Sequence, residues 1–287
     1  MRRILRMAIA AMVIAGGSAQ AADSLHRRSP CLSYLVLDAD TGKVIKSANS
    51  GAEAYPASCT KLMTAHLVYR AMRVGRIKLT DRIAQSKRSS MEQPSKLGLL
   101  PGETITVDEA MKALMVKSAN DVAVMLAEKV GGTVENFVDL MNEEAKRLGM
   151  KGTVYVSPNG LPPPKGSKRG FDRSTARDLA ILAGTLLREN PEILDYTSLS
   201  STMVTGTGGA QVWLQNHNNI LWKKKYKVKG ADGMKTGYNN AGGSSIVLTG
   251  RRTGHRAVVV VLGSNSADER DTRAGQLLED ALMSMEK

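Results

Sequence analysis

Ser58 and Lys61 lie three positions apart at the beginning of an apolar helical pattern. Residues with this spacing share one face of a helix, so the hydroxyl and the amine are expected to be neighbours. A serine hydroxyl becomes an effective nucleophile when a nearby base takes its proton. A lysine amine can be that base when burial or neighbouring cations lower its pKa. The pair therefore predicts a nucleophile with its activating base.

Two further clusters follow in the chain. Ser118-Ala119-Asn120 falls between two predicted helices, and Lys235-Thr236-Gly237 follows a glycine-rich turn. Each cluster alone is typical of structural positions, because Ser and Asn cap helices and Gly marks turns. In the order S-x-x-K, S-x-N, K-T-G, however, the three clusters form a specific pattern for serine acyl-transfer enzymes.

The middle cluster suggests a route for protons. Ser118 can pass a proton between Lys61 and the amine that leaves the substrate. Asn120 carries both a donor and an acceptor, so it can bind a substrate amide and orient Lys61. Lys117 is a further cation that could lower the pKa of Lys61.

The last cluster suggests a binding site for the end of a peptide. Lys235 offers a positive charge to a terminal carboxylate, and the Thr236 hydroxyl offers a second donor. Gly237 has no side chain, which lets an extended substrate approach the strand closely. A lysine that binds a chain terminus favours exopeptidase chemistry.

The elements that must position these residues can be read from periodicity and turn signals. Helices are predicted over residues 58–75, 106–115, 120–130, 133–148, 174–188 and 268–285. Strands are predicted over residues 32–37, 43–47, 201–205, 211–214, 227–229, 244–250 and 256–262. Residues 76–105 are predicted to be irregular. The arrangement favours an α+β fold whose antiparallel sheet takes strands from both ends of the chain, with flanking helices and an inserted all-helical part.

The beginning of the chain has the features of a secretory signal peptide. Three arginines precede an apolar run over residues 7–15, and Ala19-Gln20-Ala21 matches a cleavage site. Residues 1–21 are therefore predicted to be removed, although an uncleaved N-terminal membrane anchor is the alternative. We expect an exported protein of the periplasm or extracytoplasmic cell envelope. The formal net charge of +13 then favours anionic envelope polymers over nucleic acid as partners.

The sequence shows no pattern typical of a metal or cofactor site. His66, His217 and His255 do not belong to a cluster with metal-ligand spacing, so neither a metal nor a cofactor is expected. His66 falls inside a predicted helix and is expected to be a packed histidine. The chain has 2 cysteines, Cys31 and Cys59, and whether they pair cannot be deduced from the sequence.

Four segments carry a resemblance to a known family. Residues 56–64, 118–121, 174–180 and 233–238 resemble the low-molecular-mass penicillin-binding proteins, the serine-type D-alanyl-D-alanine carboxypeptidases. The resemblance extends over about residues 30–285. It implies the penicillin-binding transpeptidase/β-lactamase-like fold. It also implies one catalytic domain over residues 22–287 with a helical subdomain at about 83–150, and neither a C-terminal β-domain nor a membrane anchor.

The resemblance also implies a reaction. Ser58 would form an acyl-enzyme with a peptidoglycan stem peptide, release its terminal D-Ala and react covalently with β-lactam antibiotics. The backbone N–H groups of Ser58 and Tyr238 would form the oxyanion hole. Lys61 and Ser118 would complete the catalytic set, and Asn120, Lys235, Thr236, Gly237 and Tyr238 would bind substrate.

Three alternatives share the fold. A D,D-endopeptidase would cut peptidoglycan cross-links with the same residues. A β-lactamase would need a deacylating base, and the E-x-x-L-N element that supplies it in class A enzymes is not found after the S-x-N cluster. A basic cell-wall-binding protein would keep the fold without activity.

Overall fold

The structure is a computed structural model that describes residues 33–163 and 168–286. The predicted signal peptide and Cys31 lie outside the described residues.

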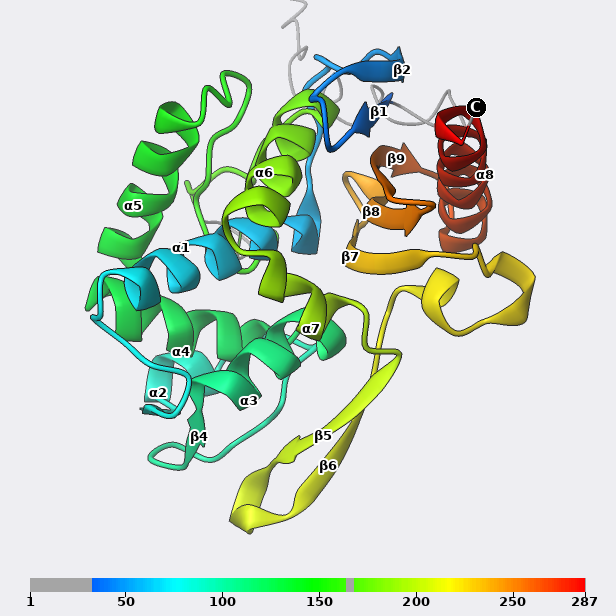
Figure 1. Ribbon diagram of the computed structural model, residues 1–287. Helices are drawn as coiled ribbons and strands as arrows, with labels where there is room; N and C mark the ends of the chain where they lie inside the picture. Colours follow the sequence, from blue (N-terminus) through cyan, green and yellow to red (C-terminus); the bar gives the residue numbers. More distant parts are fainter. Residues whose placement is uncertain (1–32, 164–167, 287) are drawn as a thin grey trace, which may run out of the picture.

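A five-stranded antiparallel sheet in the order β2-β1-β9-β8-β7 organises the molecule (Figure 1). Its strands are β1 (Ser33–Asp38), β2 (Val44–Ala48), β7 (Ala231–Asn239), β8 (Gly243–Arg252) and β9 (His255–Ser264). Strand β1 pairs with β9, so the two ends of the described chain meet in the centre of the sheet. The predicted α+β class, with an antiparallel sheet built from both ends, is confirmed.

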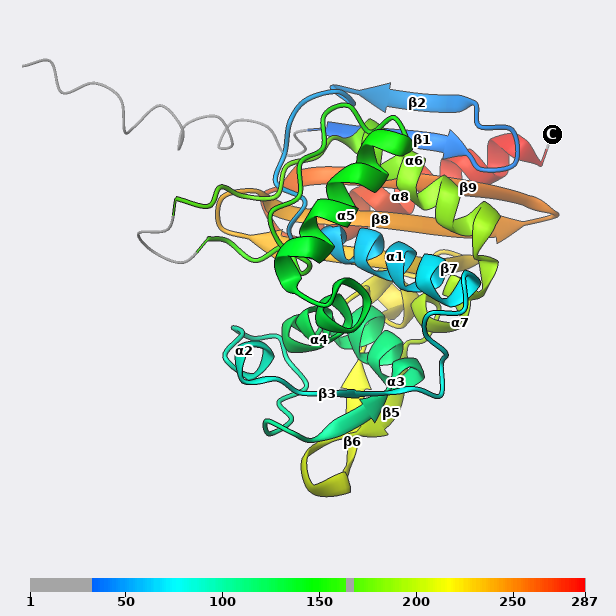
Figure 2. The ribbon, with the colours of Figure 1, turned by 90° about the vertical axis from the view of Figure 1, so that its left-hand side faces the viewer.

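Helices cover both faces of this sheet (Figure 2). Helix α8 (Ala267–Met285) packs on one face, and α1 (Lys61–Arg73) and α6 (Ala176–Glu189) lie on the other. Residues 257–262 of β9 form an uninterrupted apolar run in which every side chain is fully buried. A strand covered on both sides needs such a run, because neither face meets water.

The other helical elements lie mostly beside and below α1 in Figure 1. They are η1 (Ala57–Thr60), α2 (Lys87–Ser90), α3 (Val107–Lys112), η2 (Ala113–Lys117), α4 (Asn120–Gly131), α5 (Val134–Arg147), η3 (Pro191–Ile193), α7 (Leu194–Thr197), η4 (Thr207–Gly209), η5 (Asn219–Leu221) and η6 (Lys224–Tyr226). Helix α3 begins with a capping box, in which Thr106 and Glu109 form reciprocal hydrogen bonds.

Two small antiparallel pairs complete the fold. Strands β3 (Arg82–Ala84) and β4 (Thr104–Thr106) pair within the segment predicted to be irregular. Strands β5 (Ser201–Thr205) and β6 (Gln211–Gln215) form a hairpin that projects from the body of the molecule (Figure 1).

Three sequence-based predictions of local structure are wrong. Residues 227–229 do not form a strand, and β7 begins at Ala231. The Lys235-Thr236-Gly237 cluster therefore lies in the middle of a strand. The helix predicted over 106–115 ends at Lys112 and continues as a π-helical turn to Lys117. Residues 76–105 contain β3, α2 and β4. For the strands, pairing with residues distant in the chain decides the structure, and local patterns report it poorly.

Candidate active site

The nucleophile candidate lies in a tight turn at the edge of the sheet. Ser58 belongs to the 3₁₀ turn η1, and Lys61 is the first residue of α1. Strand β7 packs directly against this turn. A Cβ atom on Gly237 would lie 2.5 Å from the carbonyl oxygen of Pro56 and 3.2 Å from the backbone nitrogen of Ser58. Gly237 is therefore required for contact between chain segments, a different reason from the predicted approach of a substrate.

The Lys61 amine lies within hydrogen-bond distance of three oxygens. Its Nζ donates to Asn120 Oδ1 at 2.7 Å and to the Asn159 carbonyl at 2.7 Å, and it lies 2.9 Å from Ser58 Oγ, so the lone pair of a neutral amine can face the Ser58 hydroxyl. The side chain is fully buried. Burial, and then the positive charge of Lys235, hold the pKa of Lys61 well below its usual range. A neutral amine next to the hydroxyl can accept the proton of Ser58.

Ser118 and Asn120 are positioned by a break between helices. Ser118 has left-handed backbone angles (φ 60°, ψ 35°) at the end of the π-helical turn, and α4 begins at Asn120. Such a conformation is unusual for a residue other than glycine and is often found at functional sites. Within the described chain, the three hydrogen bonds of Lys61 go to Ser58, Asn120 and Asn159. Ser118 lines the same cleft without being one of these partners.

The loop over residues 92–95 supports both asparagines that hold Lys61. Asn120 donates from Nδ2 to the Gln93 carbonyl at 2.9 Å and from its backbone nitrogen to the Ser95 carbonyl at 2.7 Å. Asn159 donates from Nδ2 to Glu92 Oε2 at 3.0 Å. Glu92 and Asn159 were not predicted as site residues, because nothing in their local sequence indicates that they lie near Lys61.

Lys235 is buried beside the cleft. It is 2 % exposed, and its Nζ donates to the Thr236 carbonyl at 2.9 Å. Burial is the main cause that lowers its pKa to about 8. Strand β7 is the last strand of the sheet, so its outer edge is not paired within the described chain. An unpaired edge of this kind can accept an extended peptide as an additional strand.

A cleft of about 510 Å³ opens in front of Ser58. Six of the predicted site residues line it: Ser58, Ser118, Asn120, Thr236, Gly237 and Tyr238. The structure thus brings together the three sequence clusters, which are distant in the chain. Lys61 and Lys235 are buried and are not among the residues that line the cleft.

Two titratable residues that line the cleft, Arg270 and His217, were not predicted as site residues. The Arg270 guanidinium is held by Asp271 through Nε at 2.8 Å, and the other carboxylate oxygen of Asp271 accepts from Asn219 Nδ2. His217 also lines the cleft, where burial, with a smaller effect from Lys235, lowers its pKa to about 4. The imidazole is therefore neutral at pH 7. Neither residue lies near a motif that would have indicated its role.

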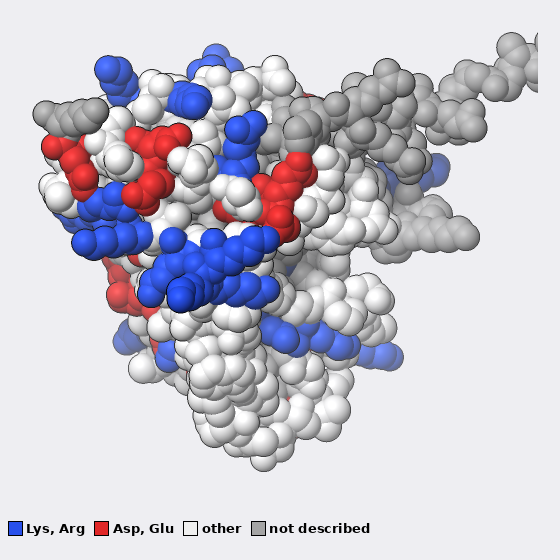
Figure 3. Space-filling model, turned by 90° about the vertical axis from the view of Figure 1, so that its right-hand side faces the viewer, with Lys and Arg blue, Asp and Glu red and all other residues white. Residues whose placement is uncertain are grey.

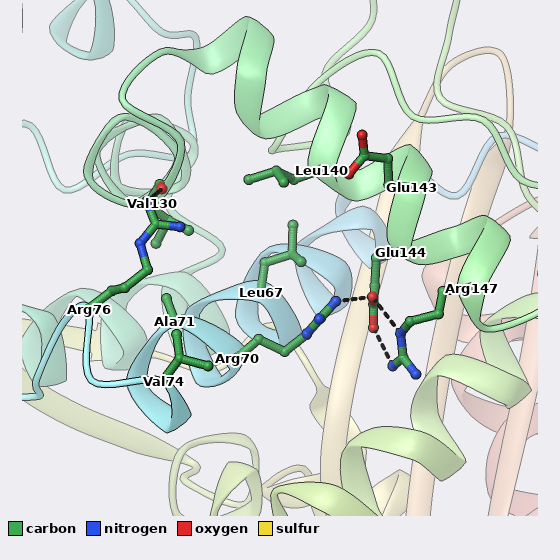
Figure 4. Close-up of a pocket in the computed structure, with 10 residues that line it drawn as sticks. All are labelled: Leu67, Arg70, Ala71, Val74, Arg76, Val130, Leu140, Glu143, Glu144 and Arg147. Carbon is green, nitrogen blue, oxygen red and sulfur yellow. Dashed lines mark hydrogen bonds and ion pairs between the residues drawn. The ribbon is translucent and has the colours of Figure 1, made fainter.

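A second hollow, of about 330 Å³, lies at the other end of α1, among the side chains shown in Figure 4. Glu144 lines it and is bound by Arg70 and by Arg147. His66 is buried and lies 2.6 Å from Glu144, from Nε2 to Oε1, as expected for a packed histidine. The charge of the buried Glu144 carboxylate is thus compensated by two guanidinium groups.

In the part of the chain that the structure describes, no group of three or more His, Cys, Asp or Glu side chains is arranged to hold a metal ion. In the same residues, none of the helices combines the length and apolar character needed to span a bilayer.

Comparison with known proteins decides the family. A family model described as D-alanyl-D-alanine carboxypeptidase, peptidase family S11, matches residues 20–266. The chain belongs to this family. It is 34% identical over 254 residues to the D-alanyl-D-alanine carboxypeptidase DacF of Bacillus subtilis (strain 168), an alignment that covers 88% of this chain and 62% of the relative. The chain spans about three fifths of the length of the curated relatives it matches.

Solved structures of the family have the same fold. The crystal structure of the carboxypeptidase DacD from Francisella tularensis superposes with a TM-score of 0.81 at 26% identity, over 96% of this chain and 74% of that one. Penicillin-binding protein D2 from Listeria monocytogenes, in its ampicillin-bound form, superposes with a TM-score of 0.70 at 28% identity, over 89% and 96%. The predicted penicillin-binding protein fold is confirmed.

Proposed function

We propose that this chain is a serine-type D-alanyl-D-alanine carboxypeptidase that removes the terminal D-Ala of peptidoglycan stem peptides. The observation that carries the proposal is the 2.9 Å hydrogen bond between Lys61 Nζ and Ser58 Oγ, because the pKa of that lysine lies well below its usual range. Membership of the family supports the choice of substrate. The predicted signal peptide supports an extracytoplasmic place of action.

The first half of the reaction uses the neutral Lys61 amine. It takes the proton of Ser58 while Oγ attacks the carbonyl carbon of the D-Ala-D-Ala bond. The backbone N–H groups of Ser58 and Tyr238 donate to the oxyanion. When the peptide bond breaks, the leaving amine takes up the proton, with Ser118 as the proposed route from Lys61. An ester between Ser58 and the shortened peptide remains.

In the second half, water hydrolyses the ester and regenerates the Ser58 hydroxyl.

The cleft residues also explain why the reaction would occur at the end of a peptide. A terminal carboxylate would accept hydrogen bonds from the Thr236 hydroxyl and from Arg270. The positive charge of the buried Lys235 would add electrostatic attraction. Asn120 would bind the backbone amide of the substrate while it holds Lys61.

β-Lactam antibiotics are proposed as covalent inhibitors that react with Ser58 in the same way. The ampicillin-bound form of the Listeria protein supports this part of the proposal. Glu92 is not positioned as the deacylating base of a β-lactamase. Its carboxylate binds Asn159, and within the described chain it lines a neighbouring hollow and not the cleft of Ser58.

Purified muropeptides test which peptide bond the enzyme hydrolyses. We expect the enzyme to release free D-Ala from monomeric pentapeptides and to leave cross-linked dimers joined. Mass spectrometry of the products distinguishes the two reactions. Conversion of dimers to monomers without release of D-Ala would instead identify a D,D-endopeptidase. If neither substrate reacts and penicillin forms no adduct, the chain is a binding protein.

Glu92 provides a test of Lys61 as the base. Its negative charge favours the protonated amine, so Glu92→Gln should lower the pKa of Lys61 further. The rate of penicillin acylation falls as Lys61 becomes protonated, so in the variant this fall should occur at a lower pH. We expect a displacement of at most about 1 pH unit. Stopped-flow acylation measured across pH checks this. The matched control is Glu135→Gln, since Glu135 is exposed and paired with Arg88. An unchanged profile, or a shift to higher pH, would contradict the assignment.

A further inference from the structure

The β5–β6 hairpin lies within a segment without charged side chains. Residues 196–222 contain no Asp, Glu, Lys or Arg, although 23% of the chain is charged. The hairpin projects from the lower part of the molecule (Figure 1), and the lower part of the face in Figure 3 is almost entirely white. The exposed part of this hairpin therefore offers hydrogen-bonding and apolar groups to a partner, and no charge.

The hairpin is held rigidly on its inner side. Val204 and Leu214 are buried against the helical part of the molecule. The Thr205 backbone nitrogen donates to Glu109 Oε1 at 3.0 Å, and the Gly208 nitrogen donates to Glu103 Oε1 at 2.7 Å. The outer face is therefore a preformed surface, which lowers the entropy cost of binding a ligand.

Three cross-strand pairs make up this outer face, because side chains alternate between the two faces of a strand. The pairs are Ser201 with Gln215, Met203 with Trp213, and Thr205 with Gln211. Trp213 is 60 % exposed and Met203 is 43 % exposed. An indole and a thioether thus lie in the centre, with hydroxyl and amide groups on both sides.

The outer face leads into the active-site cleft. Gln215, at one end of the face, lines the cleft together with Asn216 and His217, which follow it in the chain. A ligand that lies along the hairpin would therefore reach the cleft of Ser58 at this end.

The chemistry of this face matches a neutral sugar polymer. The apolar C–H face of a pyranose ring stacks on an exposed indole, and hydroxyl and N-acetyl groups pair with amides and hydroxyls. A polyanion or an anionic membrane would be expected on the exposed lysines of residues 223–229. The hairpin itself offers no such charge.

We propose that the outer face of the β5–β6 hairpin binds the glycan strand of peptidoglycan, a neutral polymer of N-acetylated amino sugars. The stem peptide attached to that strand would then enter the cleft. The choice of peptidoglycan as the biological ligand rests on the proposed function. The test of this inference measures binding of sugar oligomers, which does not require catalysis.

The test compares Trp213→Ala with Trp213→Phe and with Met283→Ala, a control at a methionine on α8 that is 54 % exposed. Each variant is titrated with soluble N-acetylglucosamine oligomers, and heteronuclear NMR follows the shifts of the hairpin amides. We expect Trp213→Ala to weaken binding by about tenfold, Trp213→Phe to retain most of it and Met283→Ala to bind as the parent. Activity on a short soluble peptide should remain unchanged in all three.

Equal binding by the parent and Trp213→Ala would overturn the inference. So would binding to phospholipid vesicles that depends on Trp213 in the absence of sugar binding, since the face would then contact a membrane. Ser58→Ala should bind the oligomers as the parent does. Sugar binding without any hydrolysis of muropeptides would leave this inference intact and overturn the proposed function instead.

Discussion

Replacement of Ser58 by alanine should abolish covalent labelling by penicillin. Without the hydroxyl there is no atom that can form the ester, and the remaining cleft residues cannot replace it. Hydrolysis of a D-Ala-D-Ala peptide should fall by at least about 10⁴-fold. Intact-mass spectrometry after exposure to penicillin measures the adduct directly, and release of D-Ala measures turnover.

A matched control is available for this change. Ser198 is exposed, directly follows α7, and its hydroxyl donates to the carbonyl of Leu194 in that helix. Ser198→Ala should be labelled as fully as the parent. Thermal denaturation of both variants shows that loss of labelling does not result from unfolding. A penicillin adduct on folded Ser58→Ala would disprove the assignment of the nucleophile.

The activity should decline above pH about 8 because Lys235 then loses its charge. Its pKa of about 8 is lowered mainly by burial, and the protonated form is the one that stabilises the substrate carboxylate. Lys61 must be neutral, so activity rises as pH increases through its lowered pKa. The profile of kcat/KM should therefore be bell-shaped, and it should fall by about tenfold per pH unit on the alkaline side.

The variant Lys235→Arg separates the two limbs of this profile. A guanidinium stays charged throughout the accessible range, so the alkaline decline should move out of it. Lys229→Arg, at an exposed lysine outside the cleft, should leave the profile unchanged. The measurement is kcat/KM for a soluble D-Ala-D-Ala peptide between about pH 5 and 10. If the alkaline decline of kcat/KM persists unchanged in Lys235→Arg, the titration of another group causes it.

Much of the fold could be predicted because its signals are local. The capping box at Thr106, the helix that follows Ser58 and the apolar run of residues 257–262 each report the environment of their own segment. The strand β7 could not be placed from its sequence, because it forms through pairing with β8. The short strands β3 and β4 were missed for the same reason.

The sequence by itself determined the residues of the three clusters and their order. Ser58 and Lys61 are one helical turn apart, so their proximity follows from local geometry. Only the tertiary structure decided that Lys61 is fully buried and close to the charge of Lys235, and both effects lower its pKa. It also brought Asn159 and Arg270 to the site. Burial and contacts between distant segments arise from packing of the whole chain, and no short segment encodes them.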